Sequence, residues 1–301
     1  HQWGFTEESL RLSRECLEQA IAIDPGYALP YAGLADHYLA STVADVPARD
    51  AMPQARELAE RALQADYDLP EGHGMLGIVA GHVDLDWAEA RRRFQLAMAN
   101  SHVPWHVRQW NAYFRLFAIG SIEEAVEEGE RTIDDDPLSQ VNYTVLGVLY
   151  EGVGLENKAR AAHEKTLELD PKFWWGWWHL GMHHAVHGRT VDARKCAEKA
   201  IAIHPTARCN IGLLAGVLQK ESYTAEAQAL LAQLPEGSSR APLALTCYHL
   251  ACGEIDAAMA WAVSAVDERN PTFAPSVVRA FEKRLAESSE WHTWLAKMNF
   301  E

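Results

Sequence analysis

The chain has 301 residues, of which 48% are hydrophobic and 23% charged, a composition typical of a folded protein and not of a disordered one. Its 27 Lys and Arg residues against 42 Asp and Glu residues give a net charge of −15. This charge repels phosphate groups and so disfavours binding to nucleic acid or anionic lipid. No apolar run approaches the roughly 20 residues of a membrane-spanning helix, so no membrane insertion is expected.

Residues 1–27 contain the remains of one helical hairpin. Leu17, Ala20 and Pro25 have the spacing of a second helix whose partner helix is mostly missing. The helical pattern begins almost at the first residue, so we expect the chain to be a fragment of a longer protein. This segment is interpreted as a partial N-terminal repeat.

Residues 28–136 contain three hairpins that keep a common pattern loosely. The first two begin with an aromatic or imidazole residue followed by a large apolar and a small residue, and the second helices carry alanines at helical spacing. The third departs from this pattern, with Trp110 and Asn111 where Leu-Gly would be expected. The first hairpin has extra residues between its helices, so a long loop is expected from Ser41 to Pro53. The marker residues of the three first helices are Tyr31, Leu34, Ala35 and Tyr38; His73, Leu76 and Gly77; and Trp110, Ala112 and Gly120.

The next two hairpins show the repeat most clearly. Pro137, Pro171 and Pro205 follow an acidic residue or His at intervals of 34 residues, which is the period of the tetratricopeptide repeat (TPR). A small residue at a fixed place lets paired helices approach closely, and the proline ends the second helix of each pair. The small and aromatic markers are Tyr143, Leu146, Gly147 and Tyr150; and Trp177, Leu180 and Gly181.

Beyond Pro205 the repeat weakens and then stops. One degenerate hairpin contains Leu214 and Ala227, and a further hairpin contains Gly253 and Ala262. Residues 272–301 lack the period but place large apolar side chains at helical spacing. A terminal repeat must cover an exposed apolar face, so these residues are expected to form capping helices. The apolar residues of this segment are Phe281, Leu285, Trp291, Trp294, Leu295 and Met298.

These observations predict an all-α fold. Antiparallel helix pairs are expected to stack into a right-handed TPR superhelix, an α-solenoid, with seven hairpins over residues 28–271. Each TPR-like pair buries its apolar face only against its neighbours, so a chain of this length can fold as one continuous array.

Three segments resemble a more specific group of proteins. The segments AIAIDPGYALPYAGLADHYL (20–39), DLDWAEARRRFQLAMAN (84–100) and FEKRLAESSEWHTWLAKMNFE (281–301) are similar to the C-terminal TPR region of multidomain bacterial signalling proteins. In that group the array follows a winged-helix DNA-binding domain, a Ser/Thr kinase domain or an adenylate-cyclase domain. The resemblance implies a sensory, partner-binding or assembly role and assigns no catalytic residue to this chain.

The segment Phe173-Trp174-Trp175-Gly176-Trp177-Trp178 is unusually rich in tryptophan. Trp177 falls at the consensus aromatic position and is expected in the core. Trp175 and Trp178 fall at positions that line the concave groove of TPR arrays, where exposed apolar surface marks interaction sites. The alternative is that these side chains fill a tightly wound interior. The predicted groove residues are Trp110, Phe114, Phe117, Val141, Val148, Trp175, Trp178 and Met182.

Two further patterns were weighed as candidate chemistry. Residues 72–77 match GxGxxG, but a helix and not a strand precedes them, so no dinucleotide site is predicted. His179, His183 and His187 share one helix face at i, i+4 spacing, which can bind Zn²⁺ or Ni²⁺. No acidic or cysteine third ligand lies nearby in sequence, so packing between hairpins is the preferred interpretation and a metal or hydrolytic site the remote one.

The sequence therefore predicts a non-enzymatic module that binds a protein or peptide, with no cofactor, no metal and no catalytic residues. A self-associating homo-oligomeric scaffold is the alternative, and a cytoplasmic location is expected. Groove positions such as Leu29, Asp36 and Ile78 replace the Lys, Arg and Asn that clamp C-terminal carboxylates in some TPR proteins, so that ligand class is not expected.

Overall fold

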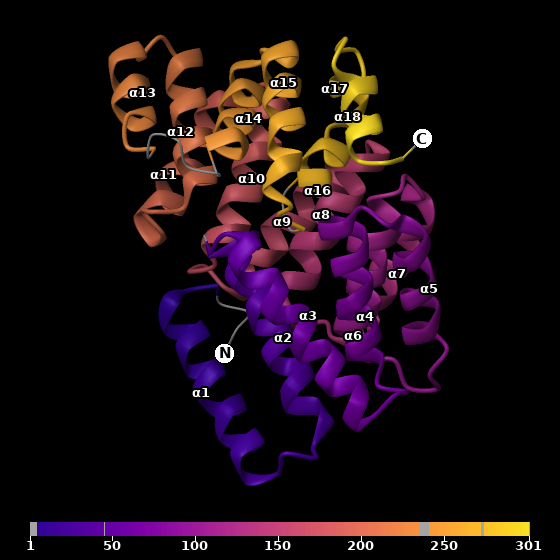
Figure 1. The fold of residues 1–301 in the computed structure, drawn as a ribbon. Coiled ribbons are helices and arrows are strands. Elements are labelled where there is room, and N and C mark those ends of the chain that lie inside the picture. Colours follow the sequence, from indigo (N-terminus) through magenta and orange to yellow (C-terminus); the bar gives the residue numbers. More distant parts are fainter. Residues whose placement is uncertain (1–4, 45, 235–240, 272–273, 301) are drawn as a thin grey trace. The chain divides into compact units, whose positions relative to one another are not determined.

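The computed structural model describes residues 5–44, 46–234, 241–271 and 274–300, and in these residues it contains helices and no strand (Figure 1). The chain divides into two compact units. The first comprises residues 1–137, 269–276 and 300, and the second comprises residues 138–268, 277–299 and 301. Within the described residues, no helix is long and apolar enough to cross a membrane.

The first unit begins with α1, which a capping box between Thr6 and Ser9 starts. Three helix pairs follow it, and two of the first helices continue into π-helical segments, η2 and η3. The bounds are α1 (Glu7–Ile23), α2 (Ala28–Val43), α3 (Ala48–Ala65), α4 (Pro70–Ile78), η2 (Val79–Asp84), α5 (Trp87–Met98), α6 (Trp105–Trp110), η3 (Asn111–Phe117) and α7 (Ile122–Asp135).

The second unit contains four helix pairs, so the described part of the chain forms seven successive pairs from α2 to α15. The bounds are α8 (Gln140–Val153), α9 (Glu156–Leu169), α10 (Trp174–Val186), α11 (Thr190–Ile203), α12 (Arg208–Lys220), α13 (Thr224–Leu231), α14 (Ala241–Cys252), α15 (Ile255–Ala265) and the short η4 (Val266–Glu268).

The two helices of a pair differ in how their surfaces are covered. In α2, thirteen of sixteen residues are buried, and in α10 twelve of thirteen are buried. In α9 only four residues are buried, at positions i, i+3, i+4 and i+7 of one helix face: Ala159, Ala162, His163 and Thr166. First helices are therefore covered on most of their surface, whereas second helices are amphipathic and face solvent on one side.

The 34-residue period has a clear backbone origin between the helices of α8–α9 and α10–α11. Gly154 and Gly188 end the first helices with φ of +77° and +75°, a left-handed conformation that glycine adopts without steric cost. Gly147 lies against the ring of His163, where an added Cβ would clash with the ring atoms. These glycines fix the turn and the close approach of the paired helices.

The residue at the consensus aromatic position reaches back six residues to a carbonyl in the turn before its helix. This hydrogen bond recurs in four hairpins. The side-chain group is a tyrosine hydroxyl, an imidazole, an indole or an amide, and the bond holds the turn against the helix that follows it. The pairs are Tyr31 Oη to Pro25 O (3.1 Å), His73 Nε2 to Tyr67 O (2.8 Å), Trp177 Nε1 to Pro171 O (2.9 Å) and Asn210 Nδ2 to His204 O (3.3 Å).

The expected long loop in the first hairpin is wrong. Helix α2 continues to Val43 and α3 already begins at Ala48, so the extra residues extend the two helices. Pro53 lies inside α3 near its N-terminal end. Proline inside a helix removes one N–H donor and is therefore usually read as a loop marker, but α3 contains Pro53 at its sixth residue.

The C-terminal segment contains α16 (Ala274–Ala280), α17 (Glu282–Leu285) and α18 (Trp291–Lys297). Helices α17 and α18 pack against α15. The Leu285 and Trp294 side chains are completely buried, and Lys297 Nζ donates to the Val263 carbonyl over 3.0 Å. Of the segments interpreted from the sequence, residues 1–4, 272–273 and 301 lie outside the described residues.

Candidate functional site

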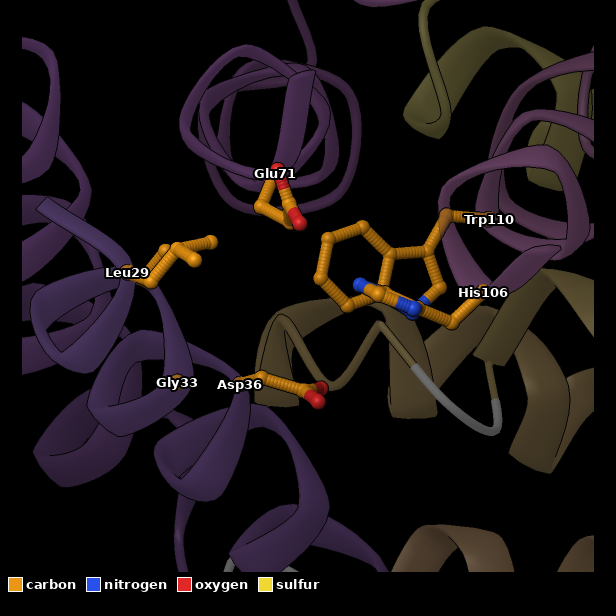
Figure 2. A pocket seen from close by; sticks show the side chains of 7 residues that line it. Leu29, Gly33, Asp36, Glu71, His106 and Trp110 are labelled. Atoms are coloured by element: carbon orange, nitrogen blue, oxygen red, sulfur yellow. The ribbon is translucent and has the colours of Figure 1, made fainter. Parts of the chain in front are cut away.

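Three successive first helices of the first unit form a small pocket (Figure 2). Its volume is about 220 Å³. Helix α2 contributes an acidic side chain, α4 contributes a second one, and α6 contributes an imidazole and an indole. Figure 2 shows the two carboxyl groups directed toward the space beside the rings. The lining residues are Leu29, Ala32, Gly33, Asp36, Glu71, His106 and Trp110.

Small residues allow the helices around this pocket to approach one another. A Cβ on Gly74 of α4 would lie 3.0 Å from the Trp110 ring, and a Cβ on Gly33 of α2 would lie 2.7 Å from the Leu17 side chain. The His106 and Trp110 rings pack edge to face, with centroids 5.2 Å apart. The aromatic wall of the pocket is thus held by close packing between α4 and α6.

The ionisable groups of the pocket are strongly perturbed. Burial, together with the nearby Glu71 charge, raises the pKa of Asp36 to about 8. Burial also raises the pKa of Glu71, against a backbone hydrogen bond that lowers it. Burial lowers the pKa of His106 to about 4, so this imidazole is neutral at pH 7. The pocket therefore combines two carboxyl groups whose charged forms are poorly stabilised with two uncharged rings.

The eight groove residues predicted from the sequence are all buried, each less than 9% exposed. Trp110 lines the pocket described above, and Phe114 and Phe117 are in η3, the segment that follows Trp110 directly. Val141 and Val148 are on α8, and the other three are on α10, a helix that contacts α8. Their role in ligand binding stays a prediction.

The expected burial of Trp177 in the core is wrong, and Trp175 and Trp178 follow the alternative of a filled interior. Trp177 is the one residue of α10 that is not buried, whereas Trp175 and Trp178 are 3% and 1% exposed. Trp178 Nε1 donates to the Cys209 carbonyl over 3.2 Å. The reason is that Trp177 occupies the position that fixes the preceding turn, and α10 is covered by α8, α9, α11, α12 and α14 on its other sides.

The histidines of α10 take part in a charged network with the neighbouring hairpin. Glu151 of α8, a buried residue, lies 2.7 Å from His183 Nδ1 and 2.5 Å from His187 Nε2. An acidic partner is thus present, although the sequence around the histidines contains none. His179 does not join it, since its ring stacks on His163 with centroids 5.7 Å apart. The three histidines do not form one site.

Arg189 determines the protonation of this network. Its guanidinium lies 2.5 Å from His183 Nε2 and 2.5 Å from a Glu156 oxygen. A guanidinium can only donate, so His183 Nε2 accepts and its Nδ1 donates to Glu151. A metal ion on His183 Nδ1 would require a proton on Nε2, which would then face Arg189. The ligand atoms of Glu151, His183 and His187 lie within 4.8 Å of one another, but their hydrogen bonding suits a closed network.

Sequence reasoning placed Asp36 in the groove but missed Glu71 and His106. A usable signal exists, because Asp36 is the single charged residue in ALPYAGLADHYLASTV and Glu71 the single carboxylate in PEGHGMLGI. Burying a lone acidic side chain in an otherwise apolar helix lowers the stability of the fold. Such residues are found at binding sites, where a ligand interacts with the carboxyl group. The meeting of these helices at one pocket could not be read from sequence.

The helix pairs and their period show an all-α tetratricopeptide-repeat fold, as predicted. No family model matches it. It is similar to the transcriptional regulator HilA of Salmonella paratyphi A and of Salmonella typhimurium, at 25% identity over 162 residues, which is 53% of this chain and 29% of that protein. The chain thus spans less than a third of the length of these relatives.

Solved structures share the fold at low sequence identity. A human IFIT1 dimer with PPP-AAAA matches with a TM-score of 0.64 and 15% identity over 92% of this chain and 68% of that chain. TTC0263, a TPR protein of Thermus thermophilus, matches with a TM-score of 0.51 and 18% identity over 61% of this chain and 98% of that chain. The Cut9 and Hcn1 complex of the APC/C matches with a TM-score of 0.57 and 13% identity over 81% of this chain and 47% of that chain.

Proposed function

We propose that this chain is a non-enzymatic, partner-binding TPR module of a bacterial transcriptional regulator. The pocket between α2, α4 and α6 carries the proposal, because consecutive first helices present it and a peptide crossing them would meet all three. The similarity to HilA over 53% of the chain supports the regulator context. In this role the array senses or recruits a partner while another part of the protein contacts DNA.

The charge of the chain favours a protein or peptide as the ligand. The human IFIT1 structures hold PPP-AAAA or Gppp-AAAA, but a net charge of −15 opposes a phosphate-rich ligand here. The thiols of the buried Cys196 and the half-buried Cys252 fit a non-enzymatic role. Burial raises the pKa of Cys196 to about 12 and that of Cys252 to about 11, so both remain protonated and unreactive at neutral pH.

Selection of displayed random peptides on the folded chain tests this proposal. We expect an enriched motif and a 1:1 complex with micromolar affinity in calorimetry. A matched selection on Leu29→Arg, which places a long, positively charged side chain at the pocket rim, should lose that motif. The absence of any enriched peptide would contradict the proposal. If light scattering then showed a dimer or larger assembly, the self-association alternative would take its place.

A further inference from the structure

We propose that the pocket between α2, α4 and α6 holds one basic side chain, the ammonium group of lysine or the guanidinium of arginine, from a bound peptide. The inference rests on the proposed function and names the feature of the partner that this pocket recognises. Its basis is the position of two acidic groups beside aromatic rings in a cavity of about 220 Å³ (Figure 2).

The Glu71 carboxyl group is placed to receive a hydrogen-bond donor. Asp36 is 5% exposed, and among the described residues Glu71 Oε2 is buried without a hydrogen-bond partner. None of the described residues that line the pocket is Lys or Arg. A buried carboxylate oxygen without a donor is unfavourable, so a cationic group that donates to it recovers the lost hydration. An anionic or purely apolar ligand would leave this cost in place.

The rings complete the recognition of a cation. An indole face attracts ammonium and guanidinium groups more strongly than other aromatic side chains do, and Trp110 forms one wall of the pocket. His106 would repel a cation if it were charged, but burial lowers its pKa to about 4 and keeps it neutral. Every polar or aromatic group in the lining thus either attracts a positive charge or is indifferent to it.

The size of the pocket limits the ligand to one side chain. Cavities that hold drug-sized molecules have volumes of ~300–1,000 Å³, and this one is smaller. Leu29, which is 42% exposed, lies among the lining residues and offers an apolar contact to the stem or to the next residue of a peptide. The net charge of −15 would also steer a basic peptide toward the chain.

Small cations provide a direct probe that needs no identified partner. The indole resonance of Trp110 in the whole chain would be followed by NMR while n-butylammonium or n-butylguanidinium is added, with butan-1-ol as the neutral analogue and sodium chloride as the ionic-strength control. We expect saturable shifts with both probes and none with the controls. Glu71→Gln should weaken binding about tenfold, and Glu60→Gln, on the exposed side of α3, should leave it unchanged.

Equal shifts with butanol, or unchanged binding in a folded Glu71→Gln, would overturn the inference. If that variant melts early, Asp36→Asn serves as the second variant under the same criterion. The peptide selection separates this inference from the proposed function. Selected peptides that bind equally well with norleucine for lysine and citrulline for arginine would exclude the basic-residue pocket and leave peptide binding intact. Saturable cation binding with no selected peptide would support the cation pocket and contradict peptide binding.

Discussion

At the residue scale, the buried carboxyl group of Asp36 lowers the stability of the folded chain at neutral pH. Its carboxyl group is 5% exposed, and burial beside Glu71 raises its pKa to about 8, compared with about 3.9 for an unperturbed aspartate. Between these two values the folded chain binds more protons than the unfolded chain does. Stability therefore falls as pH rises from 4 to 8, which is the direction opposite to that of a salt-bridged carboxylate.

Asp36→Asn should remove this loss. We expect the variant to be about 1–2 kcal/mol more stable than the wild type at pH 9, with the difference shrinking as pH falls toward 4, because the wild-type carboxyl is then neutral in both states. Urea unfolding at several pH values measures this, with Asp68→Asn at an exposed site as the control. A difference that does not change between pH 5 and pH 9 would contradict the assignment.

The tryptophans of α10 provide a second test at this scale. Trp178 is 1% exposed and its indole donates to the Cys209 carbonyl, whereas Trp177 is partly exposed. Trp178→Ala should cost about 3–5 kcal/mol of unfolding free energy, and Trp177→Ala roughly 1–2 kcal/mol through lost packing and a lost turn hydrogen bond. Chemical denaturation of the two variants compares them directly. Equal losses would show that the difference in burial does not determine their contribution.

At the element scale, the Glu151 network joins the hairpins α8–α9 and α10–α11. Burial alone would raise the pKa of Glu151, but the hydrogen bonds that His183 and His187 donate to it outweigh burial and lower the pKa. A carboxylate with a lowered pKa adds stability above its unfolded pKa of about 4.3, and this stability is lost as pH falls through the folded value. The network thus stabilises the α8–α10 contact at neutral pH.

Replacing Glu151 should therefore weaken this part of the second unit. Glu151→Gln is expected to lose about 3 kcal/mol at pH 7, because two histidines and Arg189 are left around a neutral group. The loss should shrink below pH 4, where the wild-type carboxylate becomes protonated. Thermal melts of this variant and of Glu164→Gln, an exposed glutamate on α9, test the claim. A variant as stable as the wild type at pH 7 would refute it.

The C-terminal helices α17 and α18 cap the apolar side of α15. They bury Leu285 and Trp294 against α15, whose apolar side would otherwise face water. A chain that ends before Pro275 should be poorly soluble and melt at a lower temperature. Size-exclusion chromatography and circular dichroism test this, with Lys297→Ala as a mild control that removes the hydrogen bonds of Lys297 to the Val263 carbonyl and to Asp267. A soluble monomer with an unchanged melting temperature would show that the cap is dispensable.

The repeat period made most of the fold predictable, because prolines and glycines 34 residues apart mark turns whose backbone needs those residues. The loop after α2 was not predictable, since Pro53 can sit in a loop or near a helix start. The site was less predictable. Asp36 stands out in sequence, but its pairing with Glu71 and Trp110 depends on how three helices pack. The role of Trp177 was missed because the consensus pattern does not distinguish a turn contact from core.

At the scale of the whole molecule, the net negative charge and the acidic pocket favour the same kind of ligand. An acidic TPR array presents a small, acidic, aromatic pocket on three first helices, and this suits a peptide that carries a basic residue. We assign peptide binding to the pocket of the first unit, and structural stabilisation to the histidine network of the second unit.

Site-specific photo-crosslinking tests this central claim most directly. Leu29, at the pocket, and Tyr67, in the turn before α4, are both exposed, so either can be replaced by the photoreactive residue p-benzoylphenylalanine without disturbing the core. With a selected peptide, the account predicts a covalent adduct from position 29, much less from position 67, and loss of the adduct on Glu71→Gln. Equal adducts from both positions, or an adduct that persists in a folded Glu71→Gln, would contradict it.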